Sequence, residues 1–124
     1  MGRENITIGS VGEKIALELL KDKGYAVIET NFRTPFGELD LVARHGDALV
    51  FVEVKTRTTS SLGPPSASVT RIKQRHIIKN ALFYLKRHGR VDSNWRIDVV
   101  SVKLDKSYRL ENIEIIENAV QEDY

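Results

Sequence analysis

The sequence predicts an α/β protein in which a mixed β-sheet is flanked by helices. Apolar residues recur at helical spacing in residues 9–23 and again in residues 70–88. Segments with the composition of strands lie between these helices and after the second one, at residues 25–33, 36–43, 48–55, 95–104 and 110–116. A hairpin followed by a helix and a further strand gives the order αβββαβ, here with one additional C-terminal strand. This order requires a sheet with both parallel and antiparallel neighbours.

Length and composition are those of one globular domain that spans residues 1–124, with its core at about residues 9–104. Of the 124 residues, 41% are hydrophobic and 29% are charged, which excludes disordered and membrane-spanning proteins. No apolar stretch approaches the roughly 20 residues that cross a bilayer, so we expect no membrane partner. The N-terminus leads into no apolar signal core and there are no cysteines, so we expect a cytoplasmic protein.

The first helix carries an apolar stripe and an acid at the edge of that stripe. The stripe consists of Val11, Ile15, Ala16, Leu19 and Leu20. Glu13 borders it, where the side chain can reach over the sheet and serve in catalysis. Alternatively, Glu13 is a first-turn acid that complements the helix dipole. Gly9 and Gly12, one turn apart, allow this helix to approach a sheet or a phosphate closely.

The strongest functional signal lies in a predicted hairpin around a two-residue turn at Gly46-Asp47. With that turn, Asp40 lies directly opposite Glu53. Opposed Cβ atoms are roughly 5 Å apart, and like charges there are destabilising without compensation. A divalent cation held by both carboxylates supplies the compensation, because Mg²⁺ prefers carboxylate oxygens and water. The hairpin therefore predicts a metal site, which the backbone carbonyl of Val54 can complete.

Glu38 and Lys55 face each other in the same register and on the same face of the hairpin. We expect Glu38 to hold Lys55 as a partner rather than to join the metal shell, and Lys55 to orient water or stabilise charge. Alternatively, these residues form an ordinary cross-strand ion pair and the two acids face solvent. Residues 49–54 are apolar except for Glu53, which indicates a strand covered on both faces. This disfavours the alternative, because buried acids are costly unless they are paired or metal-bound.

Charge is distributed unevenly along the chain. Residues 55–91 contain nine Lys or Arg and no Asp or Glu, whereas the rest of the chain has ten basic and seventeen acidic residues. A basic block beside a carboxylate site is typical of proteins that bind a phosphate backbone. The candidate nucleic-acid-binding residues are Arg57, Arg71, Lys73, Arg75 and Lys79. The alternative is a solvated basic helix at residues 70–88, after a polar loop at residues 57–66.

Several motifs resemble those of a known superfamily. They are Gly9-Ser10-Val11-Gly12-Glu13, Gly24-Tyr25, Asn31-Phe32-Arg33, Gly37-Glu38-Leu39-Asp40-Leu41, residues 49–57, Lys73 and Arg96-Ile97-Asp98-Val99-Val100. With them the chain resembles the PD-(D/E)XK nucleases, in particular archaeal Holliday-junction resolvases, and more closely the small bacterial YraN-like family. The resemblance covers roughly residues 9–102. Leu39 stands where the superfamily's name places a proline before the first acid, a proline that is often missing.

The resemblance implies a restriction-endonuclease-like fold and a catalytic site that depends on Mg²⁺ or Mn²⁺. It assigns Asp40 and Glu53 as metal ligands and Lys55 as the catalytic lysine. It further matches Glu13 to the additional acid of the resolvase-like branch and Lys73 to a basic residue near the site.

We therefore expect an endonuclease that hydrolyses phosphodiester bonds in nucleic acid. We expect DNA rather than RNA as its partner, with branched or structured DNA as the substrate that the resemblance implies. Two matching cuts in a junction would suit a homodimer. The alternative is a nucleic-acid-binding module of the same fold with little or no catalytic activity. A third interpretation, an assembly protein with incidental charges, leaves both the basic block and the acidic pair unexplained.

Overall fold

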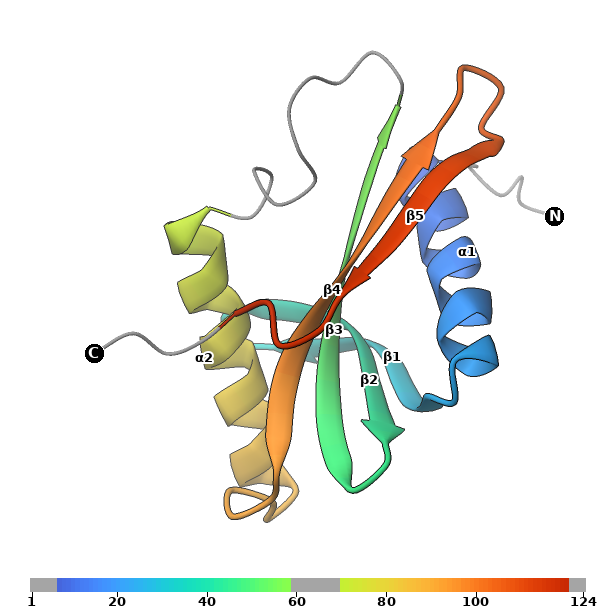
Figure 1. Ribbon diagram of the computed structural model, residues 1–124. Helices are drawn as coiled ribbons and strands as arrows, with labels where there is room; N and C mark the ends of the chain where they lie inside the picture. Colours follow the sequence, from blue (N-terminus) through green and yellow to red (C-terminus); the bar gives the residue numbers. More distant parts are fainter. Residues whose placement is uncertain (1–6, 59–69, 121–124) are drawn as a thin grey trace, which may run out of the picture.

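The computed structural model describes residues 7–58 and 70–120, and its elements follow the predicted order (Figure 1). They are α1 (Ile8–Asp22), β1 (Ala26–Thr34), β2 (Gly37–His45), β3 (Ala48–Thr58), α2 (Arg71–Arg87), β4 (Trp95–Leu104) and β5 (Leu110–Ile116). Residues 57 and 58 belong to β3, so the loop predicted for residues 57–66 begins too early. The reason is that β3 gains a partner along its whole length in β4, which pairs with it as far as Thr58. The remainder of that loop lies outside the described residues.

The five strands form one mixed sheet in the order β1-β2-β3-β4-β5. β3 and β4 are parallel, and the other neighbours are antiparallel. The two helices lie on opposite faces of the sheet (Figure 1). A mixed sheet flanked by two helices in this order is a restriction-endonuclease-like arrangement, which confirms the predicted fold class. Neither helix in the described part of the chain is long and apolar enough to cross a membrane.

The β2–β3 hairpin has the predicted turn, with Gly46 in the left-handed region at φ 62°. The predicted register holds for five pairs, from His45 opposite Ala48 to Leu41 opposite Val52, and the pairing ends there. Residues 37–39 of β2 remain paired with β1. The two strands of the hairpin therefore separate just before Asp40 and Glu53 would meet.

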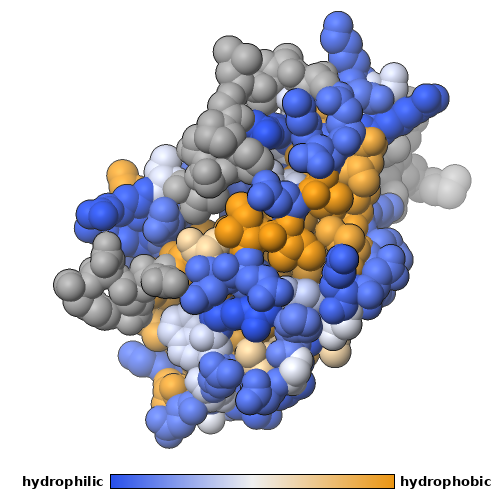
Figure 2. Space-filling model, in the orientation of Figure 1, coloured by the Kyte–Doolittle hydropathy of each residue, from blue (hydrophilic) through white to orange (hydrophobic). Residues whose placement is uncertain are grey.

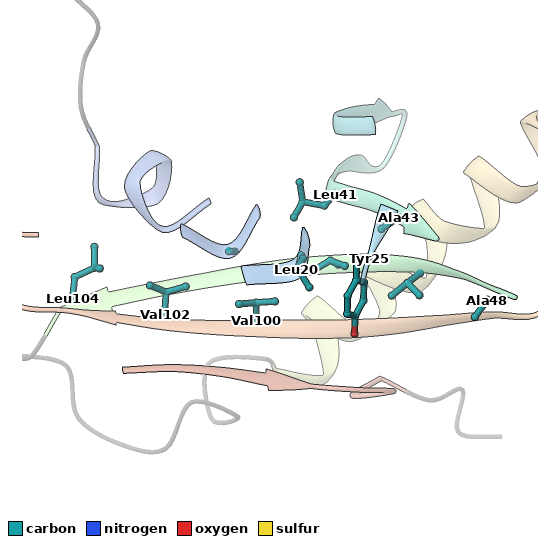
Figure 3. Close-up of a cluster of buried hydrophobic side chains, with 11 residues drawn as sticks. Leu20, Tyr25, Leu41, Ala43, Ala48, Val100, Val102 and Leu104 are labelled. Carbon is teal, nitrogen blue, oxygen red and sulfur yellow. The ribbon is translucent and has the colours of Figure 1, made fainter. Parts of the chain in front are cut away.

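The core on the α1 side is built from small and branched side chains of the central strands. Ala16 and Leu20 of α1 are fully buried against it. Figure 3 shows these side chains between α1 and the sheet, with the Tyr25 hydroxyl pointing to β4. α1 is capped by Thr7, the residue before its first, whose side chain accepts a hydrogen bond from the backbone N–H of Ser10.

On the opposite face, α2 packs its apolar side against β1 and β2. Its buried residues include Ile77, Ala81 and Leu85, which lie in one cluster with Leu39 and Phe51 of the sheet. The outer side of α2 carries six exposed Lys or Arg residues: Arg71, Lys73, Arg75, Lys79, Lys86 and Arg87. Figure 2 shows hydrophilic residues, together with a few apolar ones, at the left of the view, where α2 lies in Figure 1.

Candidate functional site

Asp40 lies where β2 separates from β3. One oxygen of its carboxylate, Oδ2, accepts a hydrogen bond of 2.8 Å from the backbone N–H of Val54. Leu41 packs in the core beneath α1, but Leu39 packs in the core beneath α2. In a regular strand these two side chains would face the same side. The chain therefore rotates at Asp40, and the carboxylate takes the place of a backbone partner for β3.

The backbone carbonyl of Val54 faces the same edge of β3 as its N–H. In an antiparallel ladder the N–H and C=O of one residue point to the same neighbour. Because the Val54 N–H is directed at Asp40, its carbonyl oxygen is also directed to the gap that β2 leaves. An oxygen at this position is available as a third ligand beside the two carboxylates.

Glu53 and Lys55 alternate with Val54 and form an ion pair, with Lys55 Nζ 3.1 Å from Glu53 Oε1. Both side chains are partly buried, with 17% of Glu53 and 24% of Lys55 exposed. Glu38 does not lie opposite Lys55, because the β2–β3 pairing ends at Leu41 and Val52. Its strand partner is Arg33 of β1, on the other edge of β2. The expected direct oppositions of Asp40 with Glu53 and of Glu38 with Lys55 are therefore wrong, although Asp40 still contacts β3 through the Val54 N–H. A supporting role for Glu38 at the site stays a prediction.

The surroundings of Asp40 oppose its ionisation. Burial first, and then the negative charges of Glu53 and Glu38, raise the pKa of this carboxyl from 3.8 to about 7. The hydrogen bond from Val54 and the positive charge of Lys55 lower the pKa, but they do not offset the burial. Asp40, Glu53, Glu38 and Lys55 therefore lie close enough to act on one another electrostatically.

Glu13 joins this group from α1. Burial raises the pKa of its carboxyl first, and the charges of Asp40 and Glu38 raise it as well. Glu13 is the sixth residue of α1, and the first turn contains no acid, so the alternative of a dipole-complementing acid is wrong. The preceding residue, Gly12, lies so close to β3 that a Cβ there would be 2.8 Å from the Cβ of Thr56. This contact holds Glu13 near Asp40 and Glu38. We call these three carboxylates, together with that of Glu53, the acid group.

The donor set suits a hard divalent cation. No group of three or more His, Cys, Asp or Glu side chains in the described ranges is arranged to hold a metal by itself. Two carboxylates with a backbone oxygen remain, and Mg²⁺ is commonly held by one or two carboxylates together with water and phosphate oxygens. Burial and the nearby charge of Glu53 raise the pKa of Asp40, and a bound cation would offset both by favouring the ionised carboxylate. Asp40, Glu53 and the Val54 carbonyl are thus the residues that could hold it.

The predicted nucleic-acid-binding residues lie mainly on another element. Arg71, Lys73, Arg75 and Lys79 are exposed on α2, and Arg57 is partly buried near the end of β3. The acids and Lys55, by contrast, come from α1, β2 and β3. The structure therefore brings the predicted catalytic residues together and presents most of the basic residues as a separate, adjacent surface.

A buried polar residue that was not predicted as a site residue supports the β1–β2 turn. Asn80 of α2 is only 4% exposed. Its Oδ1 accepts a short hydrogen bond from the Thr34 hydroxyl, and its Nδ2 donates to the backbone carbonyl of Glu38 at 3.3 Å. A polar side chain among the apolar residues of the α2 face was the available signal. Asn80 anchors the backbone two residues before Asp40.

A second polar cluster lies in the sheet beneath Tyr25. Asp98 of β4 is fully buried and accepts hydrogen bonds from the Tyr25 hydroxyl at 2.8 Å, from Arg96 Nε at 2.9 Å and from the backbone N–H of Asn118 at 2.9 Å. Arg96 also contacts His45 Nδ1 at 2.8 Å, and the His45 ring stacks on Tyr25. These bonds satisfy a buried charge and join four segments of the chain, around Tyr25, His45, Asp98 and Asn118. They explain the Arg96-Ile97-Asp98 motif by structure rather than by catalysis.

Known proteins with this sequence pattern are numerous. The chain matches the uncharacterised protein family UPF0102 over residues 12–102. A UPF0102 protein of Pelobacter propionicus is 48% identical over 120 residues, which cover 95% of this chain and 85% of that protein. A UPF0102 protein of Geobacter metallireducens is 44% identical over 121 residues, or 98% of each chain. That of Geotalea uraniireducens is 45% identical over 118 residues, or 95% of this chain and 92% of the relative. The expected resemblance is thereby confirmed, and the chain belongs to the UPF0102, or YraN-like, family of nuclease-fold proteins.

Proposed function

We propose that this protein is a metal-dependent endonuclease that hydrolyses phosphodiester bonds, in DNA rather than RNA. The observation that carries the proposal is the convergence of Asp40, Glu53 and Lys55 at the point where β2 leaves β3. An ordinary hairpin would continue its ladder through this point. Here the backbone ladder gives way to a partly buried acid whose pKa is raised to about 7. Such a group is costly to the fold, and perturbed carboxyls of this kind are concentrated at functional sites.

The residues of the site have distinct tasks in this reaction. Asp40, Glu53 and the Val54 carbonyl would hold a Mg²⁺ or Mn²⁺ ion, which would supply a lowered pKa for bound water and positive charge for the phosphate. Lys55, held by Glu53 at 3.1 Å, donates hydrogen bonds to the attacking water or to a phosphate oxygen. Glu13, with its raised pKa, is suited to exchange a proton with water at the site.

The exposed basic side of α2 supports a second candidate, a nucleic-acid-binding module without turnover. The predicted binding residues on this side, Arg71, Lys73, Arg75 and Lys79, would contact phosphates whether or not the acids act in catalysis. The two candidates differ in one respect. The endonuclease needs the acid group for its activity, whereas the binding module needs only the basic surface.

A cleavage assay distinguishes the two candidates. The full chain is incubated with end-labelled single-stranded, duplex and four-way-junction DNA, and with RNA, in Mg²⁺, in Mn²⁺ and in EDTA. We expect metal-dependent cutting that Glu53→Gln abolishes and that Asp92→Asn, a change at an exposed acid in the turn before β4, leaves intact. Cutting that persists in Glu53→Gln would contradict the assigned site. Binding without cutting under every condition would favour the binding module.

A further inference from the structure

An aromatic side chain stands exposed close to the acid group. Phe36 lies in the turn between β1 and β2 and is 49% exposed, although it is a large apolar residue. It precedes Asp40 by four residues of nearly extended chain, or at most about 13 Å at the rise of a β-strand. That distance is roughly four steps along one strand of duplex DNA at about 3.4 Å per phosphate.

The ring is held in place by α2. Its centroid lies 6.5 Å from that of Phe83, at an interplanar angle of 80°, and Lys79 Nζ lies 5.8 Å from the ring centroid. The backbone N–H of Phe36 donates to the Thr34 hydroxyl oxygen at 3.0 Å. That hydroxyl in turn donates to Asn80, which also holds the carbonyl of Glu38. The turn that carries Phe36 is therefore hydrogen-bonded to α2 both before the ring, at Thr34, and after it, at Glu38.

The chemistry around Phe36 fits a nucleotide. Lys79 and the exposed Arg75, one turn earlier on α2, supply positive charge for phosphates. An aromatic face beside such charges is the arrangement on which proteins stack the bases of single-stranded nucleic acid. Bases within a duplex are stacked on each other and are not available to it, whereas bases at a branch, gap or loop are.

We propose that Phe36 stacks on an unpaired base within a few nucleotides of the scissile phosphate. This inference rests on the proposed nuclease function and deepens it, because it defines the substrate class as nucleic acid with unpaired nucleotides beside the cleavage position. Phe36 is a specificity residue that binds substrate, and Asn80 is the residue that positions it. Duplex without such nucleotides contacts the basic surface of α2 but leaves Phe36 unoccupied.

Binding measurements test the inference independently of cleavage. Fluorescent oligonucleotides that carry 2-aminopurine in a single-stranded gap, and matched continuous duplexes, are titrated with the full chain in Ca²⁺. We expect Phe36 to quench the gap fluorescence and Phe36→Trp to retain this quenching. Phe36→Leu should lose the quenching and weaken gap binding roughly 5- to 100-fold, with duplex binding changed less than about 2-fold. Tyr108→Leu, which removes an aromatic residue that is 40% exposed between β4 and β5, is the matched control and should bind as wild type.

The outcomes separate this inference from the proposed function. Equal affinity of wild type and Phe36→Leu for gapped DNA, or equal losses for gapped and continuous DNA, would overturn the stacking role. Metal-dependent cleavage that requires Glu53 would survive either result, so the nuclease proposal would stand. A wild-type protein that binds neither oligonucleotide would overturn both.

Discussion

Asp40 replaces a backbone partner of Val54: its Oδ2 accepts the Val54 N–H at 2.8 Å in the position where the β2–β3 ladder would otherwise continue. One side chain thereby ends the hairpin pairing and becomes the centre of the acid group. The bond stabilises the ionised carboxylate, but burial and the charge of Glu53 outweigh it. The fold therefore tolerates Asp40 rather than depending on its charge.

Asp40→Asn should stabilise the protein at alkaline pH in the absence of metal. Burial and the charge of Glu53 raise the pKa of folded Asp40 to about 7, above the ordinary 3.8, so the folded state binds more protons between these values. Wild-type stability therefore falls as the pH rises through this window, whereas the asparagine has no charge to lose and can still accept the Val54 N–H. At pH 8 the variant should gain up to on the order of 4 kcal/mol over wild type, and at pH 3.5 close to nothing.

Urea denaturation of both proteins from pH 3.5 to 8 measures this difference, with Asp92→Asn as the exposed-acid control. In a second series, Mg²⁺ should raise the free energy of unfolding of wild type and leave that of Asp40→Asn unchanged. If the two proteins differ by the same amount at every pH, Asp40 is not the titrating group. If wild type gains nothing from Mg²⁺ or Mn²⁺, the metal-site assignment is wrong.

Gly12→Ala should destabilise the protein, whereas Gly9→Ala should not. A Cβ at Gly12 would overlap the Thr56 side chain of β3, while the nearest atom to a Cβ at Gly9 is the Thr7 hydroxyl at 3.9 Å. We expect Gly12→Ala to cost about 1–3 kcal/mol by overpacking. Gly9→Ala should stabilise the protein by roughly 0.5–1 kcal/mol, because alanine favours the helix. Urea denaturation of both variants decides the point, and equal effects would contradict the close approach of α1 to β3.

Neutralising Arg71, Arg75 and Lys79 together to glutamine should weaken binding to duplex DNA about equally for all sequences. These exposed residues lie in the first half of α2, where they meet phosphates without reading bases. Each lost phosphate contact should reduce the slope of log K against log salt by about 0.9. The charge-matched control neutralises Lys86, Arg87 and Arg90 at the other end of the helix. Equal slopes for wild type and the first variant would mean that this surface is only solvated.

Periodicity and turn chemistry predicted the elements closely, because both are local properties. The strand bounds 95–104 and 110–116 agree with β4 and β5, and the Gly46-Asp47 turn predicted the register of the five pairs next to it. The separation of the strands at Asp40 could not be predicted in this way. It depends on β2 staying with β1 while β3 stays with β4, and β4 lies far from β3 in the sequence.

The residues that support the site likewise depend on contacts between distant parts of the chain, which local sequence patterns do not predict. Asn80 stands out in sequence as a polar residue on an apolar helix face, but its partners Thr34 and Glu38 are 46 and 42 residues away. The acid, acid and lysine pattern was visible because Asp40, Glu53 and Lys55 lie close together in the sequence, on two consecutive strands. The contribution of Glu13 depends on how closely α1 approaches Thr56, which glycine spacing suggests and only packing determines.

Lys55→Ala should separate chemistry from binding. Lys55 is one of nine basic residues in the block from residue 55 to residue 91, so its loss should change affinity for DNA modestly. Its ammonium group lies 3.1 Å from Glu53 and lowers the pKa of Asp40. Loss of a positioned group of this kind should reduce the cleavage rate by roughly 10²-fold or more. Without its positive charge the pKa of Asp40 should rise further, so the acidic limb of the pH–rate profile should move to higher pH.

Single-turnover cleavage between pH 6 and 9, beside equilibrium binding in Ca²⁺, measures these effects. Lys103→Ala is the matched control, because Lys103 lies on the neighbouring strand β4 and forms a looser ion pair, 3.9 Å, with Glu111. Lys55→Arg should recover the acidic limb, since it restores the charge beside Asp40, but only part of the rate, because the guanidinium does not reproduce the position of the ammonium. A Lys55→Ala protein that binds and cleaves like wild type would remove Lys55 from the mechanism. A slower protein with an unmoved pH profile would leave Lys55 in catalysis but break its electrostatic link to Asp40.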